Sequence, residues 1–144
     1  MSPLNNTQKE SIIKRISFVE EEIKDLQEYK DIDWKIYAEN RKKRKELERT
    51  IENIANAIID IGKLILAGEE TMMPETYLQI FFKLKELGLI DDDDAKSITT
   101  SIKLRNILAH EYLDLRWPMI KQFIDFDYKV IEKFINIIKN YIVI

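Results

Sequence analysis

The chain contains no cysteine, one histidine (His110), three glycines and three prolines in 144 residues. Without cysteine it can form neither disulfides nor thiolate metal sites, and it has no cysteine nucleophile. A single histidine excludes a zinc site built on several histidines and an acid–base pair of histidines within one chain. Three glycines are too few for a glycine-rich phosphate loop or a dinucleotide fingerprint. We therefore expect neither a metal site nor a cofactor.

Long apolar runs are also missing. No run approaches the ~20 residues of a transmembrane helix, and the first nine residues are polar in character, so we expect no membrane segment and no signal peptide. The prediction is a soluble cytoplasmic protein. Hydrophobic residues make up 45% of the chain, which is enough to build a core and excludes wholesale disorder. At this length we expect one domain, spanning residues 1–144.

Apolar residues recur at intervals of three and four along most of the chain, which predicts an all-α fold. The clearest series has the spacing 4, 3, 4, 3, 4 and is typical of a bundle helix: Leu47, Ile51, Ile54, Ile58, Ile61 and Ile65. The pattern predicts five helices, over residues 6–29, 33–67, 74–87, 92–110 and 117–141. Short connections between them favour an up-and-down helical bundle.

The ends of these helices are predicted from capping residues. Asn6 or Thr7 is the expected cap of the first helix. Pro74 is expected to open the third helix and Pro118 the fifth, because proline is tolerated in a first turn. Gly88 is expected to end the third helix.

Positive charge is concentrated in one part of a chain whose formal charge is −3. Residues 41–66 contain seven basic and four acidic residues, a formal charge of +3. Six of the basic residues form the densest cluster, which we call the basic run: Arg41, Lys42, Lys43, Arg44, Lys45 and Arg49. One interpretation is an electrostatic footprint for phosphates. The other is the solvated end of a long helix, and charge alone favours it.

The segment from Leu104 to Tyr112 carries the most chemical information. On a helix with 100° per residue, Arg105 falls within the arc of the apolar residues Ile98 and Ile102. A buried, unpaired arginine costs several kcal/mol, so we expect Arg105 to line a cleft or an interface, with His110 nearby. The alternative is that Arg105 pairs with an internal acid and His110 caps a carbonyl.

The pattern Arg105-Asn106-x-x-x-His110-x-Tyr112 resembles the motif of HEPN-domain proteins, specifically the HepT-like ribonuclease toxins, and the resemblance extends over about residues 5–144. It implies a metal-independent endoribonuclease that is the toxin of a toxin–antitoxin pair. The implied partner is an MntA-like nucleotidyltransferase antitoxin that transfers AMP to the motif tyrosine. Arg105 and His110 would be catalytic, Asn106 supportive and Tyr112 the modified residue. The alternative for Tyr112 is a tyrosine packed at a helix end.

The chemistry of RNA cleavage suits these residues. Histidine can transfer protons near neutral pH, and arginine binds phosphate oxygens through its planar fork. Cleavage needs two proton transfers and the chain has one histidine, so we predict a homodimer with a composite site. The basic run could then contact the RNA. The competing hypothesis is a non-catalytic HEPN bundle that binds or regulates a nucleotidyltransferase.

Overall fold

The computed structural model describes residues 3–110 and 112–143, and within these residues it is built from helices without strands. Glu111 of the motif lies outside the described residues. The α-helices are α1 (Asn6–Leu26), α2 (Trp34–Glu39), α3 (Arg41–Gly68), α4 (Ile80–Glu86), α5 (Asp92–Ile107), α6 (Leu113–Gln122) and α7 (Tyr128–Val143). Two 3₁₀ turns and one π-helical segment complete the order: η1 (Gln27–Tyr29), η2 (Tyr77–Gln79) and η3 (Phe123–Asp127). The predicted all-α fold is confirmed.

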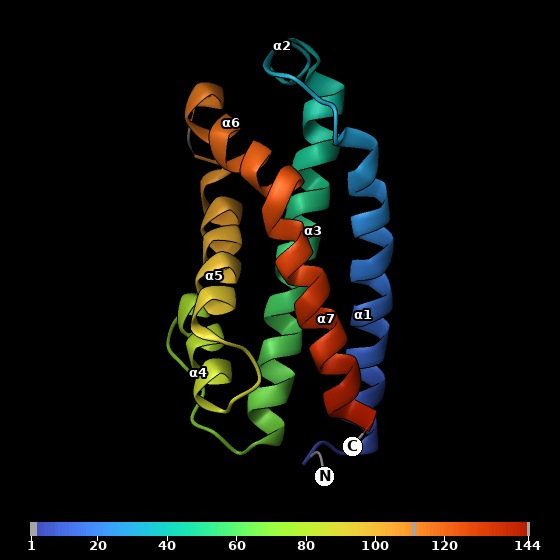
Figure 1. Ribbon diagram of the computed structural model, residues 1–144, viewed down its shortest axis with the longest axis vertical. Helices are drawn as coiled ribbons and strands as arrows, with labels where there is room; N and C mark the ends of the chain where they lie inside the picture. Colours follow the sequence, from blue (N-terminus) through green and yellow to red (C-terminus); the bar gives the residue numbers. More distant parts are fainter. Residues whose placement is uncertain (1–2, 111, 144) are drawn as a thin grey trace.

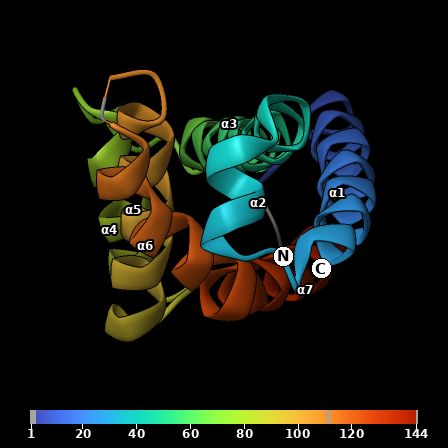
Figure 2. The same cartoon turned by 90° about the horizontal axis from the view of Figure 1, so that it is seen from above.

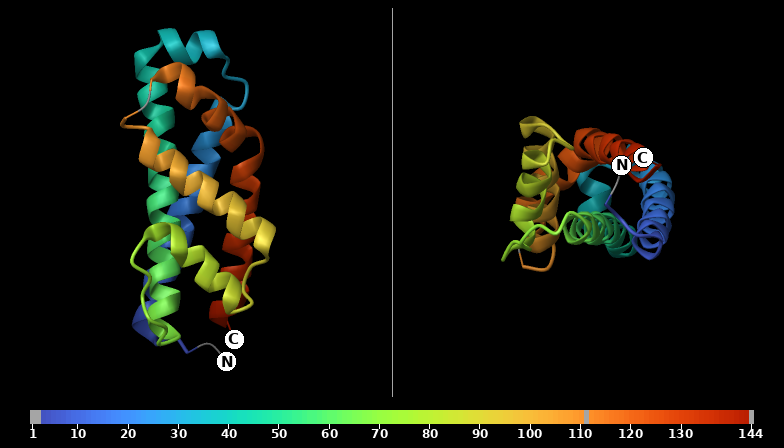
Figure 3. Two further views of the ribbon diagram at one scale, coloured as in Figure 1. Left: turned by 90° about the vertical axis from the view of Figure 1, so that its left-hand side faces the viewer. Right: turned by 90° about the horizontal axis from the view of Figure 1, so that it is seen from below.

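The long helices α1, α3 and α7 run side by side along the long axis of the molecule (Figure 1). Helices α4 and α5 pack on one side of this group, and α5 crosses α3 obliquely (Figure 3, left). The short α2 lies across one end of the bundle, where it packs against α3 and α6 (Figure 2). None of the described helices combines the length and the apolar content needed to cross a membrane.

Helix α3 forms the centre of the core. All six residues of its predicted seam, from Leu47 to Ile65, are completely buried, which confirms the seam. A seam with this spacing faces one side of the helix. Helix α1 packs along α3, and α4 and α5 also pack against α3. The path of α3 therefore fixes the position of the helices that carry the motif.

Gly62 allows α4 to approach α3 closely. A Cβ atom at this position would lie 2.5 Å from Cγ2 of Ile80 and 3.7 Å from Cζ of Phe81. The absence of a side chain thus lets the first turn of α4 pack directly on the α3 backbone. Since η2 immediately precedes α4, this close approach also brings η2 beside the next α3 residue, Lys63.

Two predictions about the first half of the chain are wrong in detail. The cap of α1 is Asn5, whose side chain and that of Gln8 form a reciprocal capping box. The predicted helix over residues 33–67 is interrupted at Asn40, which has an extended backbone (φ −99°, ψ 90°). Its side chain accepts a hydrogen bond from the amide of Lys43 and so starts α3 as a separate helix.

Predictions for the second half also need correction. Pro74 does not open a helix, because the chain from residue 71 to 76 is irregular and α4 begins only at Ile80. Pro118 lies inside α6, which already begins at Leu113. Gly88 ends its helix as predicted, with a positive φ of 82° that glycine adopts without a Cβ clash.

Candidate active site at the end of α5

Helix α5 presents the motif at its C-terminal end. At its other end the Asp91 carboxylate accepts a hydrogen bond from the amide of Asp94 (2.7 Å), and three aspartates in the first turn face the positive end of the helix dipole. The helix ends at Ile107, three residues earlier than predicted. The amide of His110 donates to the carbonyl of Ile107 (3.1 Å), which forms a turn. Arg105 thus stands in the last helical turn, whereas His110 lies beyond the helix.

Arg105 is half-buried and held by two neighbours. Its Nη1 donates to Oδ1 of Asn106 (3.0 Å), and its Cζ lies 5.6 Å from the centre of the Tyr77 ring in η2. Ile98 and Ile102 are buried, whereas Arg105, on the same side of α5 near its C-terminal end, is only partly buried. No carboxylate within residues 3–110 and 112–143 forms an ion pair with Arg105. The alternative that Arg105 pairs with an internal acid is therefore not supported by the described residues.

A second cation contacts the same tyrosine. Lys63 of α3 places its Nζ 4.3 Å from the ring centre of Tyr77, within the range of a cation–π contact. Neither Lys63 nor Tyr77 is among the site residues predicted from the sequence. Tyr77 is 44% exposed, so it is not a core residue.

His110 and Tyr112 both face solvent. His110 is exposed, and Tyr112 is 81% exposed. The backbone of Tyr112 starts α6, because its carbonyl oxygen accepts hydrogen bonds from the amides of Leu115 and Arg116 (3.0 and 3.1 Å). Because Tyr112 is 81% exposed, its ring is not packed against the described residues at this helix end.

Arg116 anchors the turn that carries His110. Its Nη1 donates to the carbonyl oxygen of Leu108, while its Nη2 lies 2.9 Å from the Glu48 carboxylate. The Tyr37 hydroxyl donates to Glu48 (2.7 Å) and accepts from Nε of Arg116 (3.2 Å). Burial, together with the bond to Glu48, raises the pKa of Tyr37 far above its usual value, so the phenol stays protonated. Sequence analysis missed this cluster.

Comparison with known proteins identifies the family. The profile of the family described as ribonuclease HepT-like matches residues 19–138, most of the chain. The chain belongs to this family. It is also similar to the tRNA nuclease HepT of Aphanizomenon flos-aquae, with 24% identity over 140 residues that cover 97% of this chain and 95% of the relative.

Solved structures share the HepT-like fold. One is a crystal structure of a toxin–antitoxin with AMP-PNP, with a TM-score of 0.82, 21% identity, and coverage of 91% of this chain and 98% of the other. Another is a tri-AMPylated Shewanella oneidensis HEPN toxin in complex with an MNT antitoxin, with a TM-score of 0.81, 22% identity, and coverage of 95% and 99%. The helical bundle is thus the fold of HEPN toxins.

The members of the basic run of this HepT-like chain have different surroundings. Arg44 donates from Nη1 to the carbonyl oxygens of Tyr37 and Ala38 (3.0 Å each), so it caps the end of α2. Arg49 lies 3.9 Å from Glu52 in a weak pair one turn away. The remaining residues of the run are exposed: Arg41, Lys42, Lys43 and Lys45. The structure therefore leaves only part of the run available for phosphates.

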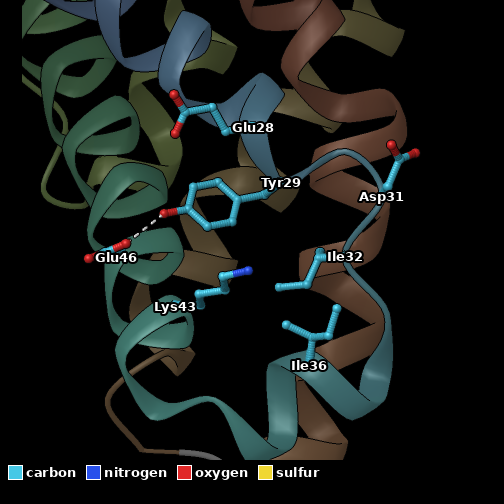
Figure 4. Close-up of a pocket in the computed structure, with 7 residues that line it drawn as sticks. All are labelled: Glu28, Tyr29, Asp31, Ile32, Ile36, Lys43 and Glu46. Atoms are coloured by element: carbon cyan, nitrogen blue, oxygen red, sulfur yellow. Dashed lines mark hydrogen bonds between the residues drawn. The ribbon is translucent and has the colours of Figure 1, made fainter.

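The surface pocket near the start of α3 does not suit a phosphate. It has a volume of about 370 Å³ and is lined by Glu28, Tyr29, Asp31, Ile32, Ile36, Lys43 and Glu46 (Figure 4). The lining residues include three acids and one lysine, so the formal charge of the pocket lining is negative. The Tyr29 hydroxyl points across the pocket to Glu46 (3.1 Å), and burial together with this bond raises the pKa of Tyr29 to about 12.

Proposed function

We propose that the chain, as a single HEPN-like domain, is an endoribonuclease toxin of the cytoplasm that cleaves RNA with Arg105 and His110 and without a metal ion. The observation that carries the proposal is the accessible pair at the end of α5: a half-buried guanidinium without a carboxylate partner in the described residues, and an exposed imidazole in the turn after it. Membership of the HepT-like ribonuclease family and similarity to a tRNA nuclease support RNA as the substrate.

The proposed reaction uses the nucleophile that RNA itself provides. The 2′-oxygen attacks the adjacent phosphorus, and a P–O2′ bond forms while the P–O5′ bond breaks. The products are a 2′,3′-cyclic phosphate and a 5′-hydroxyl. One group must accept the 2′ proton and another must protonate the departing 5′-oxygen, and imidazole suits both transfers. Arg105 would stabilise the negative charge on the phosphorane, with Asn106 holding its Nη1 in place.

A homodimer would complete this site. Each chain has a single histidine, whereas the reaction needs both a base and an acid. A twofold axis close to the end of α5 would bring two copies of Arg105 and His110 to one phosphodiester. The exposure of His110 and Tyr112 is compatible with such an interface.

The proposed partner is an MntA-like nucleotidyltransferase antitoxin that adds AMP to Tyr112. Two observations support it: neighbours in fold are toxin–antitoxin complexes, one with a tri-AMPylated toxin, and the Tyr112 side chain is 81% exposed two residues after His110. An AMP group there would place a phosphate near Arg105 and an adenosine in the path of the RNA, and so would block cleavage.

Within the basic run, Lys45 is the residue best placed to contact RNA outside the cleavage site. It is exposed, and it precedes Lys63 by eighteen residues on α3. Eighteen residues correspond to five helical turns, so both side chains project from the same face of α3, about 27 Å apart. An RNA strand that leaves the Arg105 site along this face would reach Lys45.

Cleavage of end-labelled RNA in the presence of EDTA tests the proposal. The wild-type chain is expected to cut, whereas Arg105→Ala and His110→Ala are each expected to be inactive. Lys103→Ala, an exposed residue on the same helix, serves as the control and is expected to cut normally. Equal cleavage by all four proteins would reveal a contaminating nuclease. An inactive wild type that still binds the nucleotidyltransferase would favour the non-catalytic binding module instead.

A further inference from the structure

We propose that Lys63 and Tyr77 form a second phosphate subsite beside Arg105, which binds the RNA phosphate next to the one that is cleaved. The subsite deepens the proposed ribonuclease function and rests on it. Its central element is one exposed aromatic ring in contact with two cations from different helices, Lys63 of α3 and Arg105 of α5.

The distances suit two successive phosphates. Nζ of Lys63 lies 4.3 Å and Cζ of Arg105 lies 5.6 Å from the same ring centre, so the two charges are at most about 10 Å apart. A single RNA strand carries one negative charge per nucleotide and can bridge charges at this separation. The planar fork of arginine suits two oxygens of one phosphate, while the ammonium of lysine acts as a point charge on the next.

The lack of counter-ions indicates an anion site. Three of the four lysines on α4 and α5 are paired with acids: Lys83 with Glu86, and Lys85 and Lys96 with Asp92. Neither Lys63 nor Arg105 has an ion pair among residues 3–110 and 112–143. Two cations brought together without a carboxylate repel each other. An anion bound between them would relieve this repulsion.

Backbone packing places the subsite. Gly62 lets the first turn of α4 lie directly on α3, and η2 therefore presents the Tyr77 ring between Lys63 and α5. The ring contributes a negative face that holds both cations in position before RNA binds. In this account Lys63 contacts the substrate, and Tyr77 is a positioning residue that acts through Lys63 and Arg105.

A substrate with one neutral linkage tests the assignment. Single-stranded RNA is prepared with a methylphosphonate in place of the phosphate immediately 5′ or immediately 3′ of the cleavage point. On normal RNA, Lys63→Met is expected to raise KM about tenfold with little change in kcat, because it removes one phosphate contact. On one of the two neutral substrates, the wild type and Lys63→Met are expected to have the same KM. Lys103→Met removes the same charge from an exposed position on α5 and is the control.

Binding measured without cleavage separates this inference from the proposed function. The probe is the same oligonucleotide with a 2′-deoxy nucleotide at the cleavage point, so that it binds without being cut. Fluorescence anisotropy gives its Kd at a series of salt concentrations. Lys63→Met is expected to reduce the slope of log Kd against log salt by about one, unlike Lys103→Met. If the salt slope falls by about one in Lys63→Met but not in Lys103→Met, and the wild type cuts no RNA, the nuclease proposal fails and the subsite stands. If the wild type cuts RNA but Lys63→Met behaves as Lys103→Met in both assays, the subsite is wrong.

Variants of Tyr77 test its positioning role. Tyr77→Phe keeps the ring face and is expected to preserve both kcat and KM. Tyr77→Leu removes the face, so it is expected to raise KM through Lys63 and to lower kcat through Arg105. A Tyr77→Leu protein that folds normally, as judged by circular dichroism, and has wild-type kcat and KM would overturn this role.

Discussion

Arg116 of α6 and Glu48 of α3 form an ion pair, with 2.9 Å between Nη2 and Oε2 and side-chain exposures of only 11% and 14%. The same guanidinium donates to the carbonyl oxygen of Leu108, two residues before His110. Tyr37 of α2 bonds to both members of the pair. One shielded charge pair therefore connects α2, α3 and α6 to the turn that carries the candidate catalytic histidine.

Arg116→Met is expected to lower the free energy of unfolding by about 3–5 kcal/mol, because Glu48 would lose its cationic partner in a shielded site. Urea unfolding followed by far-UV circular dichroism measures the change. The double variant Arg116→Met/Glu48→Met leaves no unpaired charge and is expected to regain most of the loss. A double variant as unstable as the single one would show that packing, and not charge, is the main contribution of Arg116.

Arg116→Lys separates the effect on activity from the effect on stability. Arg116 uses two different nitrogens, Nη1 for the Leu108 carbonyl and Nη2 for Glu48, whereas lysine has one nitrogen that cannot occupy both positions. We expect nearly normal unfolding and a kcat for RNA cleavage about tenfold lower, with KM unchanged, because the His110 turn loses its anchor. Single-turnover cleavage assays give the rate, and an unchanged kcat would contradict the role of Arg116 in holding this turn.

The helices and the seam of α3 could be predicted because burial on one face imposes a spacing of three and four residues on the sequence itself. The cluster around Arg116 could not be predicted, since Tyr37 and Arg116 are 79 residues apart and no periodic pattern relates them. The contact between Arg105 and Tyr77 is also non-local, because they are 28 residues apart. The motif predicts candidate catalytic residues, but only the packing of η2 and α6 shows which residues hold them in place.

Tyr112→Phe is expected to abolish the addition of AMP while leaving the fold and RNA cleavage intact. Tyr112 is 81% exposed and its side chain makes no capping bond, so loss of the hydroxyl removes no hydrogen bond to residues 3–110 or 112–143. Intact-mass spectrometry after coexpression with a cognate nucleotidyltransferase measures the modification. Tyr128→Phe, at a half-buried tyrosine of α7, is the control and should still acquire AMP. Undiminished modification of Tyr112→Phe would assign the acceptor to another residue.

Asp127 gives the protein a pH-dependent stability that is independent of the motif. Its side chain is buried in η3, and burial raises its pKa above the usual 3.8, partly offset by the Gln122 amide at 3.3 Å. A carboxyl with a raised pKa in the folded state stabilises the protein fully below pH 3.8, and this contribution is lost as the pH rises through the raised value. Asp127→Asn cannot ionise and should therefore be more stable than the wild type at pH 7, with a Tm about 2–4 °C higher.

Differential scanning calorimetry at pH 4 and pH 7 measures this effect. The difference in Tm between Asp127→Asn and the wild type is expected to be small at pH 4 and larger at pH 7. Asp125→Asn, two residues earlier and paired with Lys121 on the surface, is the control and should show no such gain. A variant at Asp127 that is less stable than the wild type at pH 7 would mean that the ionised carboxylate is favourable in the folded state.

Mixing the wild type with an inactive protein tests the composite site directly. The double variant Arg105→Ala/His110→Ala supplies neither group, so a mixed dimer has one Arg105 and one His110, both from the wild-type chain. If cleavage needs a histidine from each protomer as base and acid, mixed dimers are expected to be inactive, and an excess of the double variant should remove most of the wild-type cleavage. The proteins should be unfolded and refolded together so that protomers exchange, and the wild type refolded with an excess of Lys103→Ala is the control. Mixed dimers, identified by native mass spectrometry, that keep half of the activity of a wild-type dimer would mean that each chain supplies all the groups of its own site.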